Sequence, residues 1–233
     1  MFEPSPHLKV MRDTIDEMHW NISEDGNLFY DSRKIIKKPV FVIDNFYKDP
    51  DKVRQFALES DLYDDKDRLA GAIGRRVWRE EPDVIGELNN CLSDVFKQLC
   101  NHEDWHIEFD EEHHKNKWET MRFVVNVTND DEIVASKRWD DIFHVDGQYN
   151  KWASLVFLNT PEEYGEENSV PGTGFCTIQK PTKEVPKPKP KLQYVCPMKY
   201  NRAILYDANM VHGAIMKPGM YKTYDRLTQI MFF

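Results

Sequence analysis

The sequence has no uninterrupted apolar run of the roughly 20 residues that a membrane-spanning helix needs, and its first 20 residues lack an apolar signal-peptide core. Its 233 residues include only four cysteines, none in a Cys-x-x-Cys spacing, which favours buried free thiols over a disulfide framework. Basic residues number 31 against 40 acidic ones, giving a formal net charge of −9, so the surface is poorly suited to a phosphate backbone. We expect a cytoplasmic protein that does not cross a membrane, and the acidic balance disfavours nucleic acid as a partner.

What is present is enough apolar material for a large core. Hydrophobic residues make up 40% of the chain and aromatic residues 12%, a composition that excludes disorder over most of its length. The length suits one generous domain. We expect a single integrated domain in which residues 1–104 form a supporting region of helices and strands and residues 105–233 form the core.

The supporting region shows mixed helical and strand patterns. Apolar residues recur at helical spacing over residues 8–18, and residues 40–43 form a short apolar run typical of a buried strand. Asp49 and Pro50 suit the N-cap and first turn of a helix that continues through Val53. The clearest apolar stripe predicts a helix over residues 82–100 that packs against the core.

The core region has a different character, because short β-rich runs follow one another with turn-rich segments between them. These runs cover residues 121–127, 152–158, 174–178, 192–195, 203–206 and 227–233. Many short strands without intervening helices favour a mainly β fold of the jelly-roll type, with the helices of the first region packed outside.

A lysine- and proline-rich segment, KPTKEVPKPKPK, occupies residues 180–191. Proline cannot donate to a sheet ladder, so this segment should not pair centrally and should be an extended exposed loop. It is either a solvated connector or a docking surface for an acidic partner.

The first candidate site is the sequence Phe143-His144-Val145-Asp146. In an extended strand residues i and i+2 face the same side, so His144 and Asp146 can reach one metal ion. A second His-x-Asp occurs at His102, inside a charged run that favours solvated surface or an adventitious metal site.

Two further candidates lie at the ends of apolar runs in the last 32 residues, one after its run and one before it. His212 closes the run that begins at residue 202, and Arg226 opens the apolar run RLTQIMFF. An arginine before so apolar a strand indicates a buried anion, since its planar fork matches a carboxylate. Thr228, two residues along, faces the same side and can donate to that carboxylate.

Together these residues predict a specific chemistry. Two imidazoles and one carboxylate, from His144, His212 and Asp146, form the facial arrangement of non-haem Fe(II) oxygenases and leave three positions open. Two of those positions suit 2-oxoglutarate and the third suits dioxygen. Arg226 and Thr228 would then bind the distal carboxylate of 2-oxoglutarate.

The chain resembles the 2-oxoglutarate/Fe(II) oxygenase superfamily, most closely its prolyl-hydroxylase-like branch. The resemblance rests on five segments in family order, namely residues 40–47 (VFVIDNFY), His144-x-Asp146, residues 172–175 (GTGF), residues 202–213 and residues 217–226. It implies a double-stranded β-helix core and a catalytic site in which His144, Asp146 and His212 bind Fe(II). It also implies hydroxylation of a substrate, with formation of succinate and carbon dioxide from 2-oxoglutarate.

Three functions remain open at this point. The first is an active hydroxylase whose primary substrate is a small molecule, a nucleotide or a peptidyl side chain. The second is a non-catalytic jelly-roll module that holds zinc or nickel. The third, nucleic-acid modification, conflicts with the acidic balance. Further candidates for the lining of the pocket are Arg122, Asn126, Tyr149, Trp152 and Tyr206.

Overall fold

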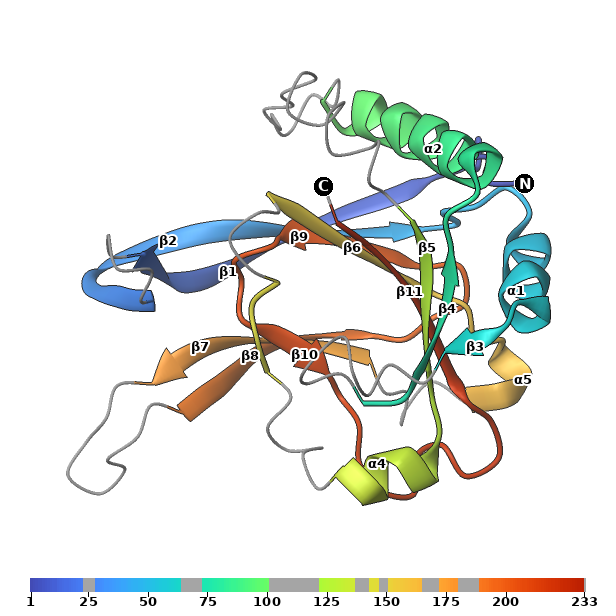
Figure 1. Ribbon diagram of the computed structural model, residues 1–233. Coiled ribbons are helices and arrows are strands. Elements are labelled where there is room, and N and C mark those ends of the chain that lie inside the picture. Colours follow the sequence, from blue (N-terminus) through green and yellow to red (C-terminus); the bar gives the residue numbers. More distant parts are fainter. Residues whose placement is uncertain are drawn as a thin grey trace.

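A computed structural model describes residues 1–22, 28–63, 73–100, 122–136, 143–146, 151–164, 172–179 and 189–232, and it is mainly β with few helices (Figure 1). The strands are β1 (Lys9–Ile22), β2 (Leu28–Asp44), β3 (Leu62–Tyr63), β4 (Arg75–Arg79), β5 (Phe123–Thr128), β6 (Trp152–Phe157), β7 (Gly172–Gln179), β8 (Lys189–Pro197), β9 (Ala203–Asp207), β10 (His212–Ala214) and β11 (Arg226–Phe232). The helices are α1 (Pro50–Glu59), α2 (Pro82–Cys100), α4 (Asp130–Ser136) and α5 (Pro161–Tyr164).

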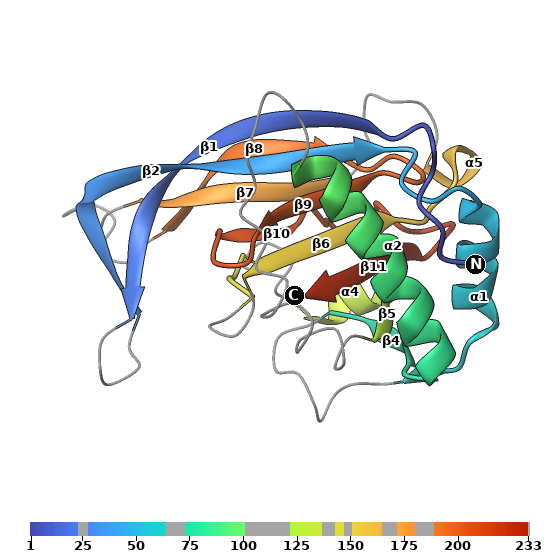
Figure 2. The same ribbon diagram turned by 90° about the horizontal axis from the view of Figure 1, so that it is seen from above.

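The strands form two antiparallel sheets. The larger has eight strands in the order β1-β2-β9-β6-β11-β5-β4-β3, and the smaller has three in the order β10-β7-β8. The two sheets lie face to face, and the long β1–β2 hairpin reaches beyond the rest of the larger sheet (Figures 1 and 2).

Pairing within these sheets follows a nested pattern. Strand β5 pairs with β11, residues 143–146 meet β10 through a bridge, β6 pairs with β9, and β7 pairs with β8. Counted from β5 to β11, the first of these segments therefore pairs with the last, the second with the second-last, and so on inward. Successive pairs alternate between the larger and the smaller sheet. A long hairpin rolled up in this way is compatible with a jelly-roll fold.

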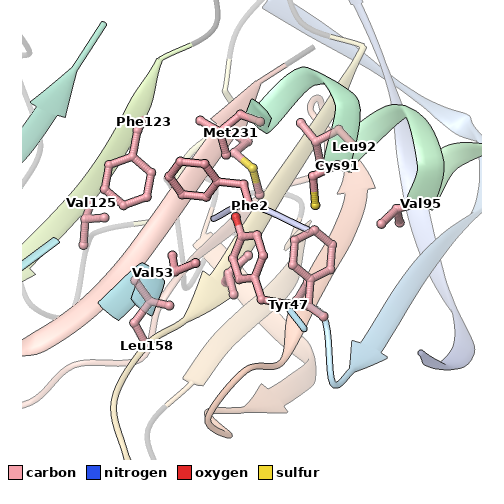
Figure 3. Packing of buried hydrophobic residues seen from close by; sticks show 14 of the residues in the cluster. Phe2, Tyr47, Val53, Cys91, Leu92, Val95, Phe123, Val125, Leu158 and Met231 are labelled. Atoms are coloured by element: carbon pink, nitrogen blue, oxygen red, sulfur yellow. The ribbon is translucent and has the colours of Figure 1, made fainter. Parts of the chain in front are cut away.

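Both faces of the larger sheet are packed against other parts of the protein. Successive side chains along each strand point to opposite faces, so each strand contributes to both packed sides. On β11, Leu227 and Met231 face the cluster under the helices, whereas Ile230 and Phe232 face the smaller sheet. We call this second side the inner face. Figure 3 shows the helix side, where residues of α2 such as Cys91 close over the sheet.

The two longer helices were predicted from their sequence patterns, and the prediction is confirmed. Helix α2 covers residues 82–100, and its apolar stripe is buried against the larger sheet, across whose strands it lies (Figure 2). Helix α1 begins after Asp49, whose carboxylate accepts a hydrogen bond from the Lys52 main-chain nitrogen at 3.4 Å. Both helices therefore pack outside the sheet. No helix in the described part of the chain is long and apolar enough to cross a membrane.

Two predictions about local structure were wrong. Residues 8–18 do not form a helix, because β1 runs through them and pairs with β2 from Lys9 to Ile22. The end of the lysine- and proline-rich segment is a strand, since Lys189, Pro190 and Lys191 pair with β7. Pro190 is tolerated there because β8 is an edge strand. Residues 180–188 lie outside the described residues, as does His102.

Candidate metal centre

His144 and His212 are brought together by the main chain of the smaller sheet. The nitrogen of His144 donates to the carbonyl of His212 at 2.8 Å, and the nitrogen of His212 donates to the carbonyl of His144 at 2.9 Å. Directly opposed residues of an antiparallel pair carry their side chains on the same face. Asp146 follows two residues after His144, and its nitrogen donates to the Ala208 carbonyl at 2.9 Å.

The three side chains form one compact group. The Nε2 atom of His144 lies 3.4 Å from Oδ1 of Asp146, and the Nε2 atom of His212 lies 3.2 Å from Oδ2. The two imidazole rings are 4.7 Å apart, and one ligand atom from each residue lies within 4.8 Å of the others. Elsewhere in the described ranges, no three His, Cys, Asp or Glu side chains approach each other in this way.

The surroundings of His212 favour a metal ion over a proton. Its Nδ1 lies 2.9 Å from the Met210 carbonyl, which can only accept, so Nδ1 carries the hydrogen and Nε2 carries a lone pair. Burial lowers the pKa of His212, although the Asp146 carboxylate opposes this. A neutral Nε2 that lies 3.2 Å from the Asp146 carboxylate can bind a divalent metal together with that carboxylate.

The group has one open side. The His144 side chain is 56% exposed, whereas those of Asp146 and His212 are 7% and 5% exposed. On the buried side, the Tyr206 hydroxyl donates to Oδ2 of Asp146 at 3.3 Å. The group is therefore open to solvent at His144, while Asp146 and His212 are buried.

Arg226 and Thr228 lie on the inner face of β11, the same side that carries Tyr206 on β9. Both are buried, and the Nε of Arg226 and the Oγ1 of Thr228 have no hydrogen-bond partner. Burial lowers the pKa of Arg226, and the neighbouring Tyr221 offsets this only in part. Among the described residues Arg226 has no acidic partner within ion-pair distance.

A buried arginine without an acid is costly unless an anion completes it. Across the sheet, Thr228 is paired with Asn126, whose Oδ1 is also buried without a partner. The inner face thus offers a group of unsatisfied donors and acceptors around Arg226. A carboxylate fits this group, because the guanidinium and the hydroxyl can both donate to it.

The other candidates for the lining divide between the two faces. Tyr206 and Asn126 lie on the inner face, whereas Trp152 packs on the helix side against Phe41, with 6.4 Å between ring centroids. Arg122 contacts Glu80 instead of the site, at 2.8 Å. Tyr149 lies outside the described residues. Residues 172–175, one of the five segments on which the resemblance rests, lie within β7.

Two contributors were not foreseen from the sequence. The Met210 carbonyl orients His212, but a main-chain atom leaves no mark on residue type. Tyr221 lies in the segment before Arg226 and is buried there beside the Arg226 guanidinium. The sequence around Tyr221 (KPGMYKTYD, residues 217–225) is largely polar and gives no signal that this tyrosine is buried.

No family model matches the sequence, and no curated protein matches it. Among solved structures, the chain is similar to a prolyl hydroxylase from Trichoplax adhaerens in complex with a hypoxia inducible factor peptide, with 14% identity, 83% of each chain covered and a TM-score of 0.43. It is also similar to a putative oxygenase from Shewanella oneidensis, with 11% identity, 83% of this chain and 81% of that chain covered and a TM-score of 0.36. These likenesses are distant. The group of His144, Asp146 and His212 is itself consistent with the 2-oxoglutarate/Fe(II) oxygenase superfamily.

Proposed function

We propose that the protein is an Fe(II)- and 2-oxoglutarate-dependent oxygenase that hydroxylates a substrate and forms succinate and carbon dioxide. One observation carries this proposal. A compact His-Asp-His group and a buried, acid-free arginine share the space between the two sheets. A metal ion and a carboxylate are the two ligands that these groups lack, and 2-oxoglutarate requires both.

The donor set suits ferrous iron. Two imidazole nitrogens and one carboxylate oxygen on one side of an ion leave the opposite positions open, which is the arrangement of non-haem Fe(II) oxygenases. A structural zinc site would instead close its tetrahedron with a fourth side chain. Within the described residues no fourth His, Cys, Asp or Glu joins the group.

The chain's own residues would bind and orient the co-substrate. Arg226 offers a planar fork to the distal carboxylate, and Thr228 adds a hydroxyl from the next residue on the same face. Their burial removes competing water, so the pairing is stronger than at a surface. Iron supplies the activation of dioxygen, and the protein supplies the ligand geometry and the dry pocket.

For the fold, we propose that the nested strand pairs form a double-stranded β-helix, with residues 105–233 as the catalytic core and residues 1–104 as its support. The order of pairs supports this, because residues 143–146 and β10 form the second pair of the nested series, directly inside the pair of β5 and β11. Within this arrangement His212 lies between β7 on one side and residues 143–146 on the other, which favours a rigid ligand position.

Succinate formation in the absence of any substrate tests the function. The protein is incubated with Fe(II), ascorbate, 2-oxoglutarate and oxygen, and succinate is measured by mass spectrometry. We expect slow formation by the wild type and by His7→Ala, which removes an exposed histidine distant in sequence from the triad, and none by His144→Ala. A metal that stays bound without any succinate would instead favour a non-catalytic binding module.

A further inference from the structure

Tyr206 is a fully buried tyrosine in direct contact with the candidate metal group. Its hydroxyl donates to Oδ2 of Asp146 at 3.3 Å, and its ring lies 4.6 Å from the ring of His212. Phe175 packs against the same ring nearly edge-on, at 5.1 Å and 78°. The Tyr206 side chain therefore lies between the Asp146 carboxylate and residues of the smaller sheet.

The two oxygens of the Asp146 carboxylate face different imidazole rings. Its Oδ1 lies 3.4 Å from the Nε2 of His144, and its Oδ2 lies 3.2 Å from the Nε2 of His212. A carboxylate between two imidazoles can bind a metal through one oxygen or through both. Binding through both would occupy one of the roughly three positions that a facial triad leaves open.

The proposed reaction cannot spare that position. A 2-oxoacid that chelates the metal takes two open positions, and dioxygen needs the third. Any device that keeps the carboxylate bound through a single oxygen therefore serves the reaction directly. A hydrogen bond to the other oxygen is such a device, because partners of a ligating group set its orientation.

We propose that Tyr206 is a positioning residue that engages Oδ2 of Asp146, so that the carboxylate binds the metal through Oδ1 alone. This inference rests on the metal site of the proposed function. The position of the tyrosine is fixed by β9, where Tyr206 is paired with Val40 of β2 on one side and with Ala153 of β6 on the other. Its ring is fully buried against Phe175 and His212, so the hydroxyl cannot move away without disturbing this packing.

A competing arrangement has the tyrosine itself as a ligand. Its oxygen lies 3.3 Å from Oδ2 of Asp146, which is long for an O–H···O bond and is also a distance at which two ligands of one ion can sit. The two arrangements differ in how many waters the metal keeps. Positioning leaves three waters on the metal, whereas ligation by the phenol oxygen leaves two.

Counting metal-bound waters tests the inference. Mn(II) alone is the probe, and field-dependent water-proton relaxation gives the number of waters on the bound ion. In the wild type we expect about three, and in Tyr206→Phe about two, a fall of about one third, because the carboxylate binds through both oxygens once the tyrosine hydroxyl no longer engages Oδ2. Tyr47→Phe is the matched control, since Tyr47 is also fully buried and donates instead to Gln229 on the helix side, at 2.8 Å.

Each other result counts against one specific claim. An unchanged number of waters in Tyr206→Phe, or a rise, overturns the positioning role, and a rise identifies the tyrosine as a ligand. Two waters in the wild type overturn it even if Tyr206→Phe fails to fold. Wild-type protein that binds no Mn(II) overturns the metal site itself, and with it the proposed function.

Discussion

His144 and His212 exchange both of their main-chain hydrogen bonds across an antiparallel bridge, and their rings lie 4.7 Å apart. Sheet pairing therefore brings these two candidate ligands together. A site held in this way is preorganised, which lowers the cost of binding a metal.

Removing the metal should leave the fold intact. The two clusters of buried residues on either side of the larger sheet contain neither His144 nor Asp146, so their packing does not depend on an ion. We expect the chelator-treated protein to unfold cooperatively, at a temperature about 5–11 °C below that of the metal-loaded form, because a ligand at 100 times its Kd adds about 2.7 kcal/mol. Loss of the far-ultraviolet circular dichroism signal on chelation would contradict this.

The two histidines should differ in their effect on stability. The side chain of His144 is 56% exposed and that of His212 is 5% exposed. We expect His144→Ala to change the free energy of unfolding by less than about 0.5 kcal/mol, as exposed substitutions do, and His212→Ala to cost roughly 1–3 kcal/mol. Both should abolish metal binding measured by calorimetry. Retained binding in either variant would exclude that residue as a ligand.

Arg226→Met should separate function from stability. Removing a buried cation that has no acidic partner is expected to leave the apoprotein equally stable or more stable, while the Kd for 2-oxoglutarate rises roughly 10- to 100-fold through loss of a charged hydrogen bond. Arg202→Met is the matched control. Arg202 is paired with the buried Asp44 at 2.6 Å, so its loss should destabilise the protein by roughly 3 kcal/mol. If Arg226→Met costs as much, Arg226 has a structural role.

Asp44 should give the protein an acid-sensitive contact. Burial opposes its ionisation, but hydrogen bonds from Arg202 and Lys199 outweigh it and hold the pKa of Asp44 below its usual value. Because the folded-state pKa is lowered, this contribution is complete above the unfolded-state pKa of about 3.9 and disappears as the pH falls through the folded-state value. Urea unfolding from pH 6 to pH 3 measures it. The wild type should lose more stability than Asp44→Asn over this range, and parallel losses would refute the assignment.

Much of the site could be predicted because its residues carry local signals. His144 and Asp146 stand at the spacing of one strand face, and Arg226 opens a strongly apolar run, so each was identifiable from its neighbours. Their closeness to His212 could only be inferred, since it depends on a bridge between residues far apart in the chain. The contact of Tyr206 with Asp146 has the same non-local origin.

The errors in the fold also have physical causes. Residues 8–18 carry apolar side chains at helical spacing, yet the pairing of β1 with β2 over their whole length decides their conformation. Long-range pairing overrides such a weak local preference. The short strands β3 and β10 have too few residues for any period to be visible.

The most direct test of the central claim is the absorption spectrum of the protein with Fe(II) and 2-oxoglutarate in the absence of oxygen. A 2-oxoacid that chelates ferrous iron at the triad should give a weak visible charge-transfer band. We predict this band in the wild type and its loss in His212→Ala. In Arg226→Met the band should appear only at much higher 2-oxoglutarate concentrations than the wild type needs. A wild-type protein that holds Fe(II) and shows no band at saturating 2-oxoglutarate would contradict the account.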